Sequence, residues 1–207
     1  MQTILNYNSI TVRFKDKTPV KDFSLNIKKG EKVLIYGPSG IGKSTLFNAT
    51  LGFIPIHKGK ILYKGEVLNS KNIWHFRKRI AYVGQYTEIF TGTVEKLINY
   101  VFSFKVNRDT QLTDKKIFHW LNYFHLTNGI YKKAYPTLSR GEKQRIMLTI
   151  ALLLNKETFL LDEPTSALDK ELTELTIEAF LKNSKTVLII SHDEEWLKYN
   201  LKQVNLK

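Results

Sequence analysis

The sequence predicts an α/β fold built on a mostly parallel β-sheet, because strand-like and helix-like segments alternate along much of the chain. The segments KVLIY (32–36), TFLLD (158–162) and TVLII (186–190) are almost continuously apolar, which is typical of strands buried in a parallel sheet. The helix expected from Ser139 is apolar nearly all round and should also be buried. Together these features predict a sheet with helices packed on both of its faces.

Two segments near the N-terminus show the pattern of half-buried strands. ITVRF (10–14) and FSLNI (23–27) alternate apolar and polar residues. Further strands are expected at 60–63 and 80–84, and further helices at about 44–51, from Lys170 and from Asp193.

Between residues 93 and 135 the pattern changes to helical periodicity, rich in Phe, Tyr, Trp and Asn. We interpret this stretch as a helical insertion, a subdomain of roughly residues 86–140. Because each motif occurs once and the chain has no internal repeat, we expect a single domain over residues 1–207.

The composition narrows the class of protein. The chain has no cysteine, which excludes disulfides and thiolate zinc sites. Its N-terminus lacks the charged start and long apolar core of a signal peptide. The most apolar run, IMLTIALLL from Ile146, is far shorter than the ~20 residues that a membrane span needs. We therefore expect a chain that does not cross a membrane by itself.

The formal net charge of +13 favours anionic partners such as nucleotides, nucleic acid or the inner face of a bilayer. The basic residues are scattered along the chain, however, and the densest cluster, FRKRI at 76–80, has three in a row. A solvated, lysine-rich surface explains the same charge.

A glycine-rich loop follows the predicted strand 32–36 and precedes a predicted helix. The loop GPSGIGKST has the spacing of a phosphate-binding loop in the strand–loop–helix context that this motif requires. Lys43 would reach the β- and γ-phosphates, Ser44 would hold Mg²⁺, and Thr45 would face the α-phosphate. The candidate nucleotide-binding residues are Gly37, Pro38, Ser39, Gly40, Ile41, Gly42, Lys43, Ser44 and Thr45.

Two adjacent carboxylates end the apolar strand FLLDE. Asp162 is placed to steer Mg²⁺, and Glu163 to orient or deprotonate a water molecule. In isolation the pair fits a solvated turn before Pro164 equally well, but beside a phosphate loop it suits a nucleotide hydrolase. A GTPase is disfavoured because NKET at 155–158 lacks the Asp of an Asn-Lys-x-Asp stretch. A Ser-His-Asp triad at 191–193 is discarded because neighbours in sequence rarely converge in triad geometry.

The stretch LSRGEKQR (138–145) has the form of a helix start. Ser139 and Glu142 are spaced as a capping box, and the N-terminal end of a helix also attracts anions. The helix therefore either caps itself or also meets a phosphate.

With GPSGIGKST, LSRGEKQR, FLLDEPTSALD and IISHD in this order, the chain resembles the ATP-binding cassette (ABC) ATPases over nearly its whole length. The resemblance implies a P-loop NTPase-type parallel sheet with flanking helices, an antiparallel β subdomain and a helical insertion. It also implies that two cassettes pack head to tail around two ATP molecules. Ser139 and the backbone of Gly141 would then meet the γ-phosphate of the partner's ATP.

Residues 138–142, LSRGE, match the signature sequence of this family, which is usually Leu-Ser-Gly-Gly-Gln, except at two positions. Arg140 replaces a glycine, and Glu142 replaces the glutamine. Arg140 either adds a positive side chain near the anionic site or points to solvent.

Four more residues match family motifs, and each has a simpler alternative. Gln85 matches the Q-loop, which senses Mg²⁺ and the attacking water, but is also an ordinary residue at a strand end. Asp169 matches the D-loop and is equally placed to cap the next helix. His192 matches the switch histidine that contacts the γ-phosphate, although a lone histidine after a strand is more often structural. Phe14 sits where an aromatic ring commonly stacks on adenine, but also fits the strand as a core residue.

The resemblance implies an ATP-hydrolysing subunit that forms a homodimer or heterodimer and docks on a separate transmembrane permease. Its expected cofactors are ATP and Mg²⁺, and its expected location is cytoplasmic, on the inner face of the cell membrane. IFTGTVEKLINY (89–100) is similar to the loops of export-type cassettes. The competing hypothesis is a non-transport cassette that acts on ribosomes or nucleic acid. We disfavour it, and expect no direct nucleic-acid binding, because the chain has neither a second phosphate loop nor sustained heptads. A stand-alone metabolic kinase ranks third, because it would not need LSRGEKQR.

Overall fold

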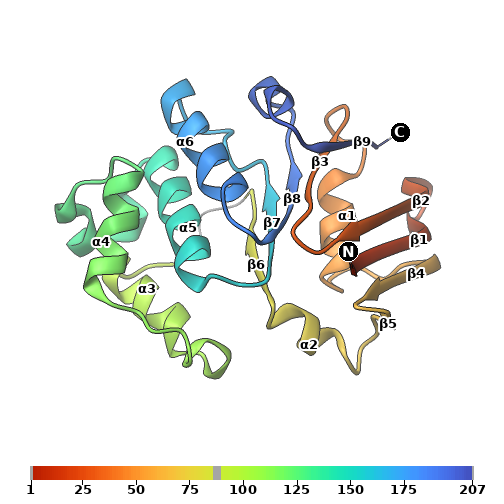
Figure 1. The fold of residues 1–207 in the computed structure, drawn as a ribbon, viewed down its shortest axis with the longest axis horizontal. Coiled ribbons are helices and arrows are strands. Elements are labelled where there is room, and N and C mark those ends of the chain that lie inside the picture. Colours follow the sequence, from red (N-terminus) through yellow and green to blue (C-terminus); the bar gives the residue numbers. More distant parts are fainter. Residues whose placement is uncertain (1, 86–89, 207) are drawn as a thin grey trace.

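The computed structural model describes residues 2–85 and 90–206, which form two β-sheets with helices packed around them. Figure 1 shows the parallel sheet in the middle of the molecule and the antiparallel strands at one end. Helices α3 (Val94–Ser103) and α4 (Asp114–Tyr123) lie at the other end. The parallel sheet thus separates the two outer parts of the molecule.

The central sheet has five strands in the order β6-β7-β8-β3-β9, and every pair in it is parallel. All residues of β7 and β8 are buried, in keeping with their continuous apolar runs. The predicted α/β architecture is confirmed. The strands are β6 (Ile80–Val83), β7 (Thr158–Asp162), β8 (Thr186–Ile190), β3 (Lys32–Tyr36) and β9 (Lys202–Asn205).

The second sheet is antiparallel, in the order β2-β1-β4-β5, and β1 starts well before the expected residue 10. Ser9 has a left-handed backbone with φ of 47°, and the register of β1 against β2 shifts between Tyr7 and Ile10. This bulge interrupts the alternation of side chains, which explains why the pattern revealed only the second half of the strand. The strands are β1 (Thr3–Phe14), β2 (Lys17–Lys28), β4 (Lys58–Tyr63) and β5 (Glu66–Val67).

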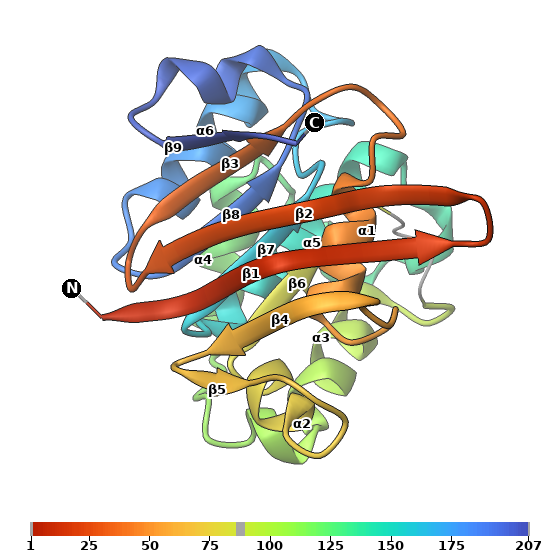
Figure 2. The same cartoon turned by 90° about the vertical axis from the view of Figure 1, so that its right-hand side faces the viewer.

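Helix α1 (Lys43–Thr50) lies directly behind β1 and β2, between the antiparallel strands and the parallel sheet (Figure 2). Its Leu46 and Phe47 are fully buried in the core that the two sheets share. The Tyr7 hydroxyl lies 2.9 Å from the Thr50 hydroxyl, so a buried hydrogen bond links β1 to the end of the helix. The antiparallel sheet is thereby fastened to the helix that follows the phosphate loop.

Helix α5 (Arg140–Leu154) packs against both the parallel sheet and the helical end of the molecule. Its Leu148 and Ala151 belong to the core beside the sheet, whereas Ile146 and Ile150 belong to the core among α3 and α4. This confirms the burial expected from its apolar surface. The remaining helices are α2 (Ile73–Arg77), α6 (Lys170–Leu181) and the 3₁₀-helices η1 (Lys105–Asn107), η2 (Asn128–Lys132), η3 (Tyr135–Thr137) and η4 (Glu194–Lys198).

Helices α3 and α4 both fall inside the predicted insertion 86–140, of which residues 86–89 lie outside the described part of the chain. The β-pairing found between residues 93 and 135 is one isolated bridge, from Thr93 to Ala134. In residues 2–85 and 90–206, no helix combines the length and the apolar character that a membrane crossing requires.

The helix expected from Asp193 proves to be a short 3₁₀-helix and not an α-helix. Asp193 caps this helix, η4, and the chain then turns into strand β9 at the edge of the parallel sheet. The buried indole of Trp196 anchors η4 to the core, and the polar sequence KQVN of β9 carries no apolar alternation that would have revealed a strand.

We predict that Gly59→Ala destabilises the protein more than Gly65→Ala. Both glycines have left-handed backbones, with φ of 80° and 87°, so both variants lose the same conformational freedom. A Cβ at Gly59 would lie 2.3 Å from the Asn8 carbonyl oxygen, whereas one at Gly65 would meet nothing within 4 Å. We expect a loss of about 1 kcal/mol for Gly65→Ala and a further 1–3 kcal/mol for Gly59→Ala, measured by urea unfolding. Equal losses would show that the bulge in β1 yields freely.

Candidate active site

The phosphate loop connects β3 to α1 at the carboxyl edge of the parallel sheet. Gly42 begins α1 with φ of 117°, a conformation that side chains rarely adopt. A Cβ there would lie 2.3 Å from the Pro19 carbonyl oxygen, so glycine also allows β2 to pack against the loop. The start of α1 carries no acidic residue and no side-chain cap, which leaves its N–H groups and positive dipole end available to an anion.

The side chain of Lys43 folds back over this loop. Its Nζ donates hydrogen bonds to the carbonyl oxygens of Gly37 (2.8 Å) and Pro38 (3.0 Å), and the residue is buried. An ammonium group is thus held against the concave backbone, where a phosphate would find a positive charge already in position.

Ser44 and Asp162 meet although they come from distant parts of the chain. The Ser44 hydroxyl donates a hydrogen bond of 3.1 Å to Asp162 Oδ1. Burial raises the pKa of the Asp162 carboxyl, and the neighbouring Glu163 charge adds to this effect, while the Ser44 hydrogen bond and the Lys43 charge oppose it. The hydroxyl and the carboxylate together present hard oxygen ligands at one point.

Glu163 directly follows β7 and has a left-handed backbone, with φ of 51°. Its N–H donates to the Ile190 carbonyl (2.8 Å), which prolongs the contact between β7 and β8. Its Oε2 lies 2.8 Å from Nδ1 of His192, whose side chain is 70% exposed, compared with 10% for Glu163. Glu163 and His192 are therefore adjacent, and both follow central strands of the sheet.

Lys43, Ser44 and Glu163 line a pocket of about 270 Å³ at the mouth of the phosphate loop. Gln85, just after β6, reaches the same pocket and is exposed. Gly37, Pro38 and His192 line an adjoining hollow of about 240 Å³. The pocket is lined by Ser39, Gly40, Gly42, Lys43, Ser44, Thr45, Gln85 and Glu163.

Two other predicted residues lie beside this region. Ile41 is half-buried and packs against the core shared by the two sheets. Phe14 is 44% exposed at the tip of the β1–β2 hairpin, so it is not the core residue that the alternation also allowed. Pro19 of the same hairpin touches Gly42, which brings the hairpin to the phosphate loop.

The predicted signature forms a complete helix cap. The Ser139 hydroxyl accepts from the Glu142 N–H (3.2 Å), and Glu142 Oε2 accepts from the Ser139 N–H (2.8 Å). The latter bond holds the pKa of the Glu142 carboxyl below its usual value. Arg140 is exposed at the first helical position. A Cβ at Gly141 would lie 2.9 Å from the Ala167 carbonyl, so close packing already requires a small residue there.

The structure does not bring every predicted residue together. Ser139, Gly141 and Asp169 are not among the described residues that line the phosphate-loop pocket. Asp169 caps α6, because its Oδ1 accepts a hydrogen bond of 2.9 Å from the Leu172 N–H. This is the capping role that the sequence offered as the alternative to the D-loop.

Gln144 is a buried residue that the sequence motifs did not predict as part of the site. Its Nε2 donates to the Pro164 carbonyl at 3.1 Å and so ties α5 to the turn after Glu163. In the sequence it stands among the polar residues at the start of α5, between Lys143 and Arg145, so the local pattern did not mark it as buried.

Comparisons with known proteins identify a family for this chain. The family model described as "ABC transporter" matches residues 20–166. The manganese transport system ATP-binding protein MntB of Listeria innocua is 31% identical over 198 residues, which cover 91% of this chain and 80% of MntB. The ATP-dependent lipid A-core flippase of Mannheimia succiniciproducens is 32% identical over 191 residues, which cover 89% of this chain and 32% of the flippase.

A solved dimeric structure of an ATP-binding cassette in a post-hydrolysis state, bound to ADP and Pi, has the same fold. Its TM-score is 0.84 at 24% identity, with 99% of this chain and 94% of that chain covered. The chain spans only between a quarter and about a third of the length of several permease and flippase relatives. Since the family model covers most of the sequence, the chain belongs to the ABC transporter family, as one of its ATP-binding cassettes.

Proposed function

We propose that this cassette binds Mg-ATP in the phosphate-loop pocket and hydrolyses it to drive transport through a membrane-embedded partner. The observation that carries this proposal is the convergence of two distant segments at one pocket: Lys43 and Ser44 line it together with Glu163, and Asp162 accepts a hydrogen bond from Ser44 beside it. A cationic loop, oxygen ligands and a carboxylate are the parts that phosphoryl transfer to water needs.

Ser44, Asp162 and Gln85 would hold the metal ion. Hydroxyl, carboxylate and amide oxygens are the hard ligands that Mg²⁺ prefers, and the Ser44–Asp162 contact brings two of them within 3.1 Å. When bound, Mg²⁺ neutralises charge that develops on the phosphate oxygens.

The protein's own groups would do the rest by position and charge. Lys43 and the first N–H groups of α1 bind the phosphates and stabilise negative charge on them. Glu163, held beside His192, orients the attacking water in line with the bond that breaks and takes up its proton. Phe14, exposed at the tip of its hairpin, would stack on the adenine ring.

The position of the signature supports a sandwich of two cassettes. Ser139 and Gly141 do not line their own chain's pocket among the described residues, yet they form an ordered, exposed helix start. Such an end, with Arg140 beside it, suits the phosphate of a nucleotide held by a second cassette. The same arrangement would let Asp169, exposed at the start of α6, act across the dimer.

A surface away from the pocket suits the membrane partner. Trp74 on α2 is 62% exposed and lines, with Phe104 and Val106, a hollow of about 780 Å³. The Arg77 guanidinium lies 5.0 Å from the Trp74 ring and 4.7 Å from the exposed ring of Phe53. Contiguous exposed aromatic side chains are rare on monomers and mark contact sites. We call this group, Phe53, Trp74, Tyr100, Phe104 and Val106, the aromatic surface.

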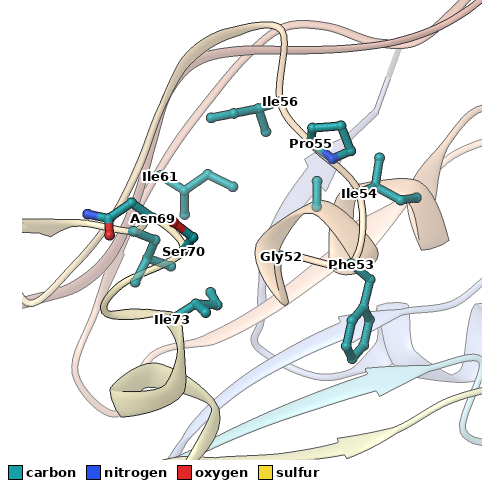
Figure 3. A pocket seen from close by; sticks show the side chains of 11 residues that line it. Gly52, Phe53, Ile54, Pro55, Ile56, Ile61, Asn69, Ser70 and Ile73 are labelled. Carbon is teal, nitrogen blue, oxygen red and sulfur yellow. The ribbon is translucent and has the colours of Figure 1, made fainter.

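A second hollow continues from Phe53 between α1 and α2. It measures about 410 Å³ and is predominantly apolar (Figure 3). Ile56, Ile61 and Ile73 are among its lining residues. We propose that a segment of the permease covers both hollows, which would keep the cassette on the inner face of the cell membrane. We propose export as the direction of transport, because the sequence of residues 89–100 is similar to the loops of export-type cassettes. Ile89 lies outside the described part of the chain.

We predict that Glu163→Gln lowers kcat for ATP hydrolysis about 10²- to 10⁴-fold and leaves ATP binding intact, because only the proton acceptor is lost. Lys43→Ala should instead weaken ATP binding about 10- to 100-fold, since a charge-assisted contact is removed. Phosphate release and fluorescent-nucleotide binding would separate the two effects. Parental turnover in either variant would contradict the assigned site.

We predict that Asp162→Asn stabilises the protein free of nucleotide and metal while abolishing Mg²⁺-dependent turnover. Because burial raises the pKa of Asp162, the folded protein holds this proton more tightly than the unfolded chain does. Stability is therefore lost as pH rises from the ordinary value of 3.8 through the raised pKa. The amide cannot ionise, so the melting-temperature gain of Asp162→Asn should grow over this window and stay level above it. A gain that is independent of pH would refute the burial argument.

We predict that Trp74→Glu abolishes co-purification with a polytopic membrane protein and preserves basal ATP turnover, since the change desolvates a charge at the proposed interface. The tagged Glu163→Gln protein, with and without Trp74→Glu, would be purified with Mg-ATP from detergent extracts and analysed by mass spectrometry. Gln203→Glu adds the same charge on the exposed edge strand β9 and serves as the control. Equal recovery with Trp74→Glu would exclude the aromatic surface, and ribosomal proteins in place of a permease would overturn the transport role.

A further inference from the structure

The His192 imidazole is held in place although little packs around it. Its side chain is 70% exposed, yet Nδ1 lies 2.8 Å from Glu163 Oε2. An exposed ring is not located by core packing, so the backbone that carries it must be held by other contacts. The contacts of the flanking residues supply that support.

The neighbours of His192 form a tight local turn. The Asp193 N–H donates to the Ser191 hydroxyl at 3.0 Å, and Asp193 Oδ1 accepts from the Glu195 N–H at 3.0 Å. Ser191 is buried, so this turn starts from the core. These bonds shape the His192 loop, but none of them connects it to the segment that carries Glu163.

Thr165 makes that connection. Its hydroxyl donates a hydrogen bond of 2.8 Å to Asp193 Oδ2. Thr165 is buried and lies in the turn that follows Glu163. This side-chain hydrogen bond therefore joins the two loops on which Glu163 and His192 lie, in addition to a longer bond of 3.4 Å from the His192 N–H to Glu163 Oε2.

Trp196 gives this hydrogen bond its direction. The indole Nε1–H lies 3.3 Å from the Thr165 oxygen, and an indole nitrogen can only donate. The hydroxyl accepts from Trp196 and must therefore direct its single proton to the Asp193 carboxylate. Trp196 is fully buried, so the chain of contacts runs from the core to the His192 loop.

We propose that Thr165 and Asp193 are positioning residues that hold His192 opposite Glu163, with the Trp196 indole orienting the Thr165 hydroxyl. The inference rests on the proposed roles of Glu163 and His192 in hydrolysis. Without the Thr165 hydroxyl, the Asp193 carboxylate and the indole N–H both lose a partner, and the His192 loop loses one of the contacts that fix its position relative to Glu163.

Thr165→Val tests the contact, because it removes the hydroxyl and preserves the side-chain shape. We expect kcat to fall about 10- to 100-fold with an unchanged KM for ATP, since misplacing a reacting group affects turnover and not ground-state binding. Thr165→Ser should restore turnover. In a His192→Ala background, Thr165→Val should cause no further loss, because its effect acts through His192.

Thr158→Val is the matched control. Thr158 is also buried, but its hydroxyl has no hydrogen-bond partner within residues 2–85 and 90–206. This variant should keep parental turnover. Asp193→Asn, which leaves only one acceptor oxygen, should reproduce the loss of kcat and serves as a second test if Thr165→Val does not fold.

A measurement without turnover distinguishes this inference from the proposed function. The imidazole ¹⁵N resonances of His192, assigned with His192→Ala, should shift in Thr165→Val and keep their parental positions in Thr158→Val. Unchanged resonances, or a folded Thr165→Val protein with parental kcat, would overturn the positioning role. An inactive parental protein would instead count against the proposed hydrolysis, and the resonances would still test the contact.

Discussion

The parallel pairing of β3, β8 and β7 is the interaction on which the candidate site depends. The register sets Ile35 beside Ile190 and Asp162 beside Ile190, so all three strands end at one level. The phosphate loop, the carboxylates and the His192 loop each follow one of these strands. Residues far apart in sequence therefore converge at the carboxyl edge of the sheet, where ligands bind in folds of this kind.

The site also stores conformational strain that the surrounding structure must oppose. A left-handed glutamate such as Glu163 costs about 1–3 kcal/mol and persists only when its neighbours hold it. The Ile190 carbonyl binds its N–H, and Gln144 binds the next carbonyl, that of Pro164. Helix α5 thus supports the turn after Glu163 and also presents the signature at its exposed start. Gln144 and the signature both belong to the N-terminal part of α5, so the signature lies close to the turn that holds Glu163.

The phosphate pocket and the proposed docking surface lie in different regions of the molecule. The phosphate pocket lies at the sheet edge, whereas the aromatic surface is formed by α2 and the segments around α1 and α3. Gln85 follows β6 and ends at the pocket, while α2 precedes β6 and carries Trp74. A single short strand therefore joins the proposed ATP site to the proposed docking surface along the chain.

Local chemistry let the sequence by itself determine the phosphate loop, the Ser139–Glu142 cap and the buried central strands, because glycine spacing, capping residues and apolar runs act over a few residues. The tertiary structure alone decided what depends on distant partners. It limited the helix expected from Asp193 to a short 3₁₀-helix. It also added strand β9, whose sequence has no apolar alternation, to the edge of the parallel sheet. It exposed Phe14 on its hairpin and joined Thr165 to Asp193. Long-range contacts of this kind leave no periodic signal in the sequence.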